Sequence, residues 1–122
     1  MASLMALYNL SSSVVISECV FKSNYSETDG SSRTEGWTIY QVGGTLSINN
    51  SDFIDNWGYY ANDGIFNNSD WSQFVDCRFI GNGYVYNSPV LYNIDTSPLI
   101  INCLFEDNRN GDDGDDAYGG LL

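Results

Sequence analysis

The sequence predicts an all-β protein that folds as one domain, residues 1–122, a single-stranded parallel β-helix of four coils. Three observations support this fold. One motif occurs four times at intervals of 26 to 32 residues, a period typical of stacked structural repeats. No window has the periodicity of an amphipathic helix, whereas short apolar alternations bounded by Asn, Asp and Gly recur throughout. Asn, Ser, Gly, Asp and Tyr dominate the composition, as in strands and turns.

The repeated motif is Phe-x-x-Asn, with a Cys or Ser two residues before the Phe and an apolar residue five before it. Inside a β-helix the phenylalanines would stack at the strand spacing of about 4.8 Å. The asparagines follow where a sharp turn is needed, and Asn tolerates the left-handed backbone and can hydrogen-bond from coil to coil. We therefore interpret both columns as a structural ladder. It consists of Phe21, Phe53, Phe79 and Phe105 with Asn24, Asn56, Asn82 and Asn108.

A small inward column accompanies the ladder, made of Cys19, Ser51, Cys77 and Cys103. On adjacent coils, the Cα atoms of Cys77 and Cys103 would lie about 5 Å apart, within the disulfide range. Stacked side chains run parallel, however, and the cysteine count is odd. Free thiols that act as small apolar core residues are therefore favoured over a disulfide.

Each coil is expected to contain three short strands and three turns. Bends are predicted at Glu18, Asn50, Asp76 and Asn102, because the alternation changes phase there. The expected coils are approximately 4–35, 36–61, 62–87 and 88–118, with 119–122 the start of a fifth. The insertions Tyr25–Gly36 and Arg109–Tyr118 are expected to leave the sheet on one edge.

A second repeated element, an aliphatic residue, an aromatic residue and an amide, precedes the motif. Its aromatic residues are Tyr8, Tyr40, Phe66 and Tyr92. Alternation does not fix whether they point inward or outward. We favour an inward, core column over an outward ladder of rings that could stack on sugars.

These motifs resemble the Phe-x-x-Asn and Gly-Gly-x-x repeats of polymorphic outer membrane proteins, the Gly-Gly pair standing intact at Gly119-Gly120-Leu121-Leu122. More broadly, the chain is similar to the pectate-lyase-like solenoids. The resemblance implies a right-handed β-helix and a secreted or cell-surface protein. It implies little about function, since unrelated activities share this architecture.

Composition excludes several classes of partner. The net charge is −12, with four Lys plus Arg and no His, which argues against nucleic acid and anionic membrane surfaces. No apolar run is long enough for membrane insertion. Met1–Leu10 lacks the basic region and apolar core of a signal peptide, so a secreted form is expected to be a mature or excised piece. Without His, a zinc site or a Cys-His nucleophile lacks its partners.

Two further features suggest possible modifications or ligands. Asn-x-Ser sequons mark Asn9, Asn49 and Asn67 as possible N-glycosylation sites, while the sequon at Asn24 belongs to the ladder. No cofactor is expected, apart from possible weak calcium binding in an acidic run that lacks EF-hand spacing. Its residues are Asp112, Asp113, Asp115 and Asp116.

The function that follows is a structural extracellular module without enzymatic activity. No capping helix is predicted at either end, and the last residues of the sequence occupy the same position in the repeat as the first. Copies are therefore expected to stack head to tail into a fibre, unless the chain is part of a longer surface solenoid. The alternative is an adhesin module that binds carbohydrate or protein. A polysaccharide lyase or hydrolase is the remote alternative, and Arg78 beside Asp76 and Asn102 is its only plausible cluster.

Overall fold

A computed structural model describes residues 6–27, 37–59, 64–84 and 89–110. In this part of the chain every regular element is a β-strand, and no helix is present that could cross a membrane. The first half contains β1 (Leu7–Leu10), β2 (Val14–Ser17), β3 (Val20–Lys22), β4 (Tyr25–Glu27), β5 (Ile39–Val42), β6 (Thr45–Asn49), β7 (Asp52–Ile54) and β8 (Trp57–Tyr59). The second half contains β9 (Ile65–Asn68), β10 (Trp71–Val75), β11 (Arg78–Ile80), β12 (Gly83–Tyr84), β13 (Leu91–Asn93), β14 (Leu99–Ile101), β15 (Leu104–Glu106) and β16 (Arg109–Asn110).

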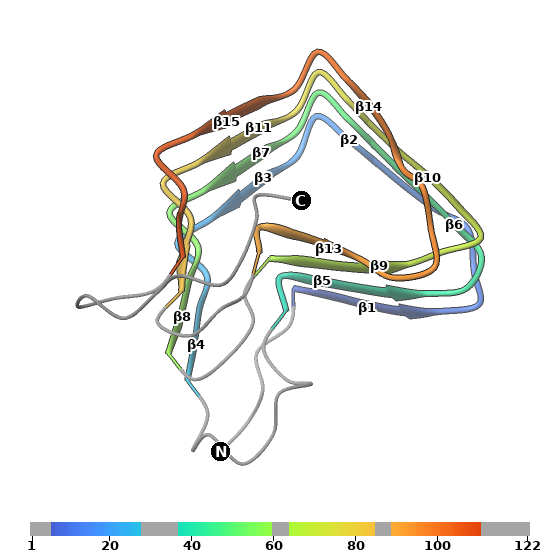
Figure 1. The fold of residues 1–122 in the computed structure, drawn as a ribbon, viewed down its shortest axis with the longest axis horizontal. Helices are drawn as coiled ribbons and strands as arrows, with labels where there is room; N and C mark the ends of the chain where they lie inside the picture. The colour runs from blue at the N-terminus through green and yellow to red at the C-terminus, as the bar shows by residue number, and fades with distance from the viewer. Residues whose placement is uncertain (1–5, 28–36, 60–63, 85–88, 111–122) are drawn as a thin grey trace.

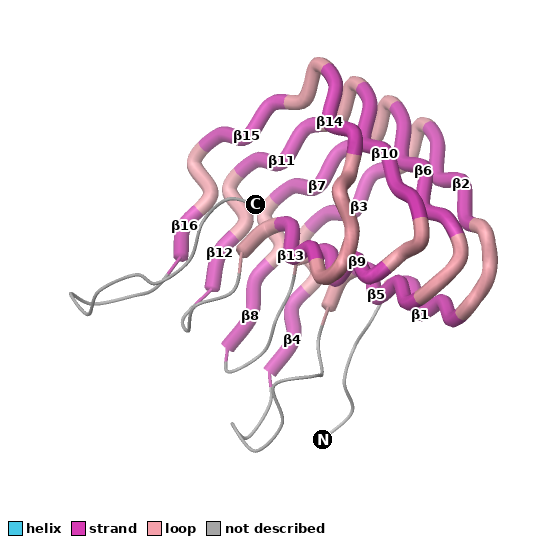
Figure 2. The backbone as a smooth tube through the Cα atoms, turned by 45° about the vertical axis from the view of Figure 1, so that its right-hand side comes forward, coloured by secondary structure: helices cyan, strands magenta, loops and turns pink. Residues whose placement is uncertain are grey.

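The strands form four parallel sheets that share one stacking direction (Figures 1 and 2). The first sheet is β1-β5-β9-β13, the second β2-β6-β10-β14, the third β3-β7-β11-β15 and the fourth β4-β8-β12-β16. Each successive group of four strands is therefore one rung, from rung 1 (β1–β4) to rung 4 (β13–β16). This stack of four parallel rungs is consistent with a β-solenoid.

The core occupies the space enclosed by the sheets. Strand side chains alternate between faces, and the buried positions in β6 are Leu46 and Ile48 while their neighbours are half-buried. In the first sheet, Ile39 pairs in register with Ile65, and Ile65 with Leu91, all three fully buried. An apolar column thus runs through the stack at this inward position.

The bend between the second and third sheets is confirmed at all four predicted positions. Glu18, Asn50, Asp76 and Asn102 have φ angles of 55°, 46°, 53° and 51°. These left-handed conformations are tolerated best by short polar side chains. The change of alternation phase in the sequence therefore located this bend correctly.

The sequence predicts that the ladder asparagines form the bend between the third and fourth sheets. The structure shows a different arrangement. The left-handed residue is instead the one before each asparagine, with φ angles of 54° at Ser23, 51° at Asp55, 66° at Gly81 and 53° at Asp107. Turning the chain one residue earlier lets the asparagine side chain point inward. The expectation that Asn itself adopts the left-handed backbone is wrong.

Each rung has four strands where three were expected. β4 pairs with β8 and β16 pairs with β12, so the first residues of both predicted excursions lie within the fourth sheet. The prediction that the excursions begin at Tyr25 and Arg109 is wrong, and 28–36 and 111–118 lie outside the described residues. The strands of this sheet are two or three residues long, too short to show alternation in the sequence.

The two end rungs leave part of the core exposed. Among the described residues, the partly buried apolar side chains that pack on the buried cluster come from rung 1 and rung 4. They are Leu7, Val14 and Phe21 in rung 1, and Ile100, Cys103 and Phe105 in rung 4. We call these two surfaces the rung-1 face and the rung-4 face.

Candidate functional site

The phenylalanine column forms a continuous stack through all four rungs. Ring centroids lie 4.8 Å apart between Phe21 and Phe53, 4.9 Å between Phe53 and Phe79, and 4.6 Å between Phe79 and Phe105. Adjacent rings are within 7° of parallel. This separation equals the strand spacing, because residues aligned in register point the same way. Phe53 and Phe79, in the middle rungs, are essentially buried.

The asparagine column is joined by hydrogen bonds at each step. Asn56 Oδ1 accepts from Asn24 Nδ2 at 2.8 Å, Asn82 Oδ1 from Asn56 Nδ2 at 2.8 Å, and Asn108 Oδ1 from Asn82 Nδ2 at 2.9 Å. The same three oxygens accept the backbone N–H of the preceding asparagine at 3.0–3.2 Å. The Nδ2 groups also donate back to the carbonyl oxygens of Phe21, Phe53 and Phe79. The amides therefore satisfy buried backbone groups that no strand pairing reaches.

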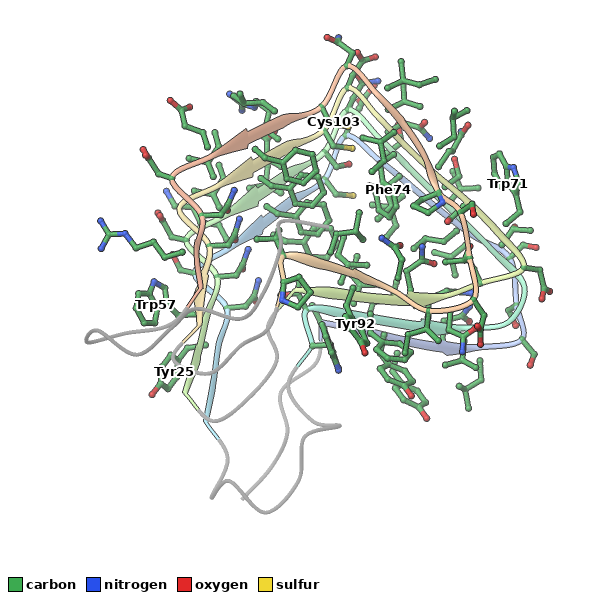
Figure 3. The ribbon with its side chains drawn as sticks, viewed as in Figure 1. Tyr25, Trp57, Trp71, Phe74, Tyr92 and Cys103 are labelled. Carbon is green, nitrogen blue, oxygen red and sulfur yellow. The ribbon has the colours of Figure 1, made fainter. Side chains whose placement is uncertain are left out.

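The Cys/Ser column lies beside the phenylalanines, and Figure 3 shows Cys103 facing the interior. All three thiols are free; Cys77 is buried, Cys103 half-buried and Cys19 exposed at rung 1. Burial raises the pKa of Cys77 to about 11. A thiol with this pKa stays protonated at neutral pH, which suits a packing role and not a nucleophile.

A second amide column lines the inside of the bend between the first and second sheets. The sequence shows these amides in each repeat, but they were not predicted to form a hydrogen-bonded ladder. The column consists of Asn9, Gln41, Asn67 and Asn93. Asn9 Nδ2 donates to Gln41 Oε1 at 2.8 Å, and Asn67 Nδ2 donates to Asn93 Oδ1 at 2.8 Å. Gln41 also donates to the carbonyl oxygens of Ser12 and Gly43. The available signal was the amide that follows the aromatic residue in every repeat.

Two of the possible N-glycosylation sites belong to this inward column. Asn67 is fully buried, and its amide also bonds to Ser69 and Ser72. Asn9 faces the same interior and is bonded to Gln41. Only Asn49 points outward, where its Nδ2 donates to Ser47 Oγ at 3.1 Å. The Asn67 side chain is therefore not accessible in the fold, and glycosylation at Asn49 stays a prediction.

The aromatic column of the first sheet points outward, so the inward orientation favoured from the sequence is wrong. Tyr8 is 56% exposed and Tyr92 is 40% exposed, and Tyr92 lies outside the sheet in Figure 3. The rings stack on one another, with centroids 5.2 Å apart for Tyr8 and Tyr40 and 4.5 Å apart for Tyr40 and Phe66. The faces of Tyr40 are thus covered by Tyr8 and Phe66, whereas Tyr8, at the end of the column, has a ring partner on one side only among the described residues. Inside the column, the geometry does not offer the open ring faces that sugars stack on.

The cluster considered for a lyase does not form as expected. Arg78 pairs with Asp52, its neighbour in the third sheet, and its Nε donates to Asp52 Oδ1 at 2.7 Å. Asp76 accepts a hydrogen bond from Asn102 instead. The hydrogen bond from Arg78 holds the pKa of Asp52 below its ordinary value, although burial acts in the opposite direction. Arg78 and Asp52 share a strand position, one residue before each Phe, whereas Asp76 lies at the bend.

In the part of the chain that the structure describes, the other exposed aromatic side chains are Tyr25 and Trp57 on the fourth sheet and Trp71 on the second. Tyr25 and Trp57 are register partners, and the Trp57 indole lies over Gly83, where an added Cβ would meet it at 3.0 Å. Among the described residues no cluster of three His, Cys, Asp or Glu could hold a metal. The acidic run Asp112, Asp113, Asp115 and Asp116 lies outside the described residues. No family model matches the chain, and no curated protein or solved structure was found that is similar to it.

Proposed function

We propose that this chain is a structural module of a secreted or cell-surface protein, a right-handed parallel β-helix whose rungs continue into further rungs at both ends. The further rungs belong either to a longer surface solenoid or to other copies in a fibre. Handedness follows from the general preference of parallel crossover connections, which are right-handed in almost all sheets. The resemblance to outer-membrane-protein repeats supports the location.

The observation that carries this proposal is the incomplete burial of the core at the two end faces. Phe53 and Phe79 are 2% and 0% exposed, whereas Phe21 and Phe105, in the same column, are only partly buried. Stacked repeats bury their inward residues only against neighbouring repeats. Within the described residues, the inward columns are committed to stacking, packing and amide hydrogen bonds. A further rung at either face would complete the same contacts.

A second candidate is a module that binds carbohydrate or protein, as an adhesin does. It is favoured by the exposure of Tyr25 and Trp71, which are 51% and 48% exposed on the outer faces. Aromatic side chains of this kind are frequent at binding surfaces. The interior of the aromatic column of the first sheet gives no added support, because its ring faces are stacked. We assign no reaction to the chain, since Arg78 is paired with Asp52.

A tandem fusion tests whether the rungs continue. Two copies joined directly should unfold in one cooperative transition with a higher thermal midpoint than a single copy, because the joint removes two end faces. Unfolding at the single-copy midpoint would contradict the structural proposal. The control is the same fusion with a long Gly/Ser linker, which permits contact but does not hold the rungs in register.

A glycan array distinguishes the binding module. Saturable binding that is lost in Trp71→Ala or in Trp57→Ala, while the variant remains folded, would favour the second candidate. Absence of such binding, together with stabilisation of the tandem, supports a structural role.

A further inference from the structure

We propose that the rung-4 face of one copy docks on the rung-1 face of a second copy in a single register, with the columns of the second, third and fourth sheets of rung 4 continuing into the same columns of rung 1. This inference rests on the proposed structural function and identifies the partner as the chain itself. It assigns rung 1 of the second copy to the position of a fifth rung. The strands β2, β3 and β4 would then pair with β14, β15 and β16; in the first sheet the inward residue of β13, Leu91, is already fully buried within the chain.

The outward apolar residues are placed for this register. In the third sheet, one outward column reads Val20, Asp52, Arg78 and Leu104. Val20 and Leu104 are 63% and 45% exposed, and each stands beside a charged residue in its own chain. In the proposed register Leu104 meets Val20 of the second copy. An apolar pair then forms at the joint, and the charged pair of Asp52 and Arg78 lies within each copy.

The second sheet repeats this arrangement. Its outward column reads Val15, Ser47, Gln73 and Leu99. Val15 is 74% exposed and Leu99 is 50% exposed, whereas the two middle residues are polar. Leu99 would meet Val15 of the second copy. Apolar residues at both ends of a column with a polar middle are explained by contact between the ends.

Charge is complementary in a third column. It reads Lys22, Ile54, Ile80 and Glu106, so the base stands in rung 1, the acid in rung 4 and neutral residues lie between them. Both charged side chains are exposed. The proposed register places Glu106 of one copy one strand spacing, about 4.8 Å, from Lys22 of the next. Opposite charges on adjacent strands of one face stabilise the pairing.

The asparagine ladder gives the docking a direction. In rungs 1 to 3, each asparagine donates its backbone N–H and one Nδ2 hydrogen to Oδ1 of the next rung. In the described part of the chain, Asn24 Oδ1 accepts no such bond, and Asn108 donates forward to none. A joint between rung 4 and rung 1 pairs the donors with the acceptor. A two-fold joint between two rung-4 faces would bring donors against donors.

Charge reversal tests the register. Lys22→Glu and Glu106→Lys each place like charges at the joint and should weaken self-association by roughly two- to tenfold. The double variant carries both changes in one chain, so it restores an opposite pair at every joint and should recover the association of the unmodified chain. Sedimentation of the full chain at several concentrations gives the comparison. The effect should shrink at high salt. Weakening by the single variants without recovery in the double variant would overturn the register.

Cysteine crosslinking tests the same register through the interior. In the Cys77→Ser background, which copies the serine at position 51, the remaining thiols lie three rungs apart, about 14 Å, so they cannot be bridged within one chain. Adding Cys19→Ser gives a chain with only Cys103, and adding Cys103→Ser gives a chain with only Cys19. A short thiol crosslinker such as dibromobimane should give covalent dimers only when the two chains are mixed. Dimers of the Cys103-only chain alone would indicate the two-fold joint and overturn the proposal.

A folded chain that remains monomeric at the highest soluble concentration overturns this inference but leaves the structural function standing, because a longer solenoid could supply the neighbouring rungs. A tandem fusion that is no more stable than one copy would instead remove the structural function. Circular dichroism of each variant confirms that the β-structure is retained before association is compared.

Discussion

Replacing Asn82 by alanine should be among the most destabilising single changes in the described core. Asn82 is 2% exposed, and its side chain takes part in four hydrogen bonds. Alanine would leave the backbone N–H of Asn56 and the carbonyl oxygen of Phe53 without these partners, and both residues are buried. An unsatisfied buried group costs about 1–3 kcal/mol, so the two together cost about 2–6 kcal/mol. The total free energy of unfolding of a domain is typically about 5–15 kcal/mol.

Asn24→Ala is the matched control in the same ladder. Asn24 Nδ2 donates to Asn56 Oδ1, which keeps its bond from the Asn24 backbone. The loss of one half-buried hydrogen bond should cost only about 0.5–1.5 kcal/mol. Urea denaturation of both variants, followed by circular dichroism, measures the difference. Equal costs for Asn82→Ala and Asn24→Ala, with unchanged denaturant slopes, would refute the reasoning that buried amides hold the rungs together.

Three further predictions follow from the columns. Phe79→Ala should cost about 3–5 kcal/mol and Phe21→Ala clearly less, because Phe21 lies at the half-exposed rung-1 face; equal costs in thermal unfolding would contradict this burial argument. Cys19 should react rapidly with a thiol reagent and Cys77 only after unfolding. Because the pKa of Cys77 is raised to about 11, its contribution to stability should be present at neutral pH and lost as pH rises from about 8.5 to 11. Alkaline unfolding that is unchanged in Cys77→Ser would argue against this pH dependence. Asp52→Asn should cost under about 1 kcal/mol at pH 7, because its ion pair is exposed; since its folded-state pKa is lowered, the difference from the unmodified chain should disappear as pH falls through that pKa, and a difference that persists in acid would contradict the sign.

The inward columns could be predicted from the sequence because repetition and alternation both mark them. Phe53 and Phe79 recur at a constant interval, and residues at the same repeat position stack in register. The bend at Asn50 was also predictable, because the period of two fails there. Each of these features depends on local spacing, which the chain shows directly.

The direction of the aromatic column could not be obtained in this way. A strand such as Ile39–Val42 alternates, but either set of side chains can face inward. The face that carries Ile39 and Gln41 is the buried one, and Gln41 is bonded there to backbone carbonyl groups across the bend. An amide that satisfies a buried bend outweighs the apolar surface of Tyr40. Such a preference depends on the position of neighbouring rungs, which the sequence does not state.

The partner of Arg78 illustrates a signal that was present but not used. Asp52 and Arg78 both stand one residue before a motif phenylalanine, which places them side by side on adjacent strands. Asp76, although nearer in sequence, belongs to the left-handed bend. Position within the repeat therefore predicts contacts better than proximity along the chain.

The asparagine column has an electrostatic consequence. Backbone hydrogen bonds between rungs run in both directions, as in Asp55 N–H to Ile80 and Arg78 N–H to Ser51, so their dipoles largely cancel along the axis. In rungs 2 to 4, by contrast, each ladder asparagine accepts at its Oδ1 from the preceding rung. The aligned amide carbonyl groups give the stack a partial negative charge at its rung-1 end and a partial positive charge at its rung-4 end. Copies added to either end are oriented by this field, so a growing stack would have two chemically different tips.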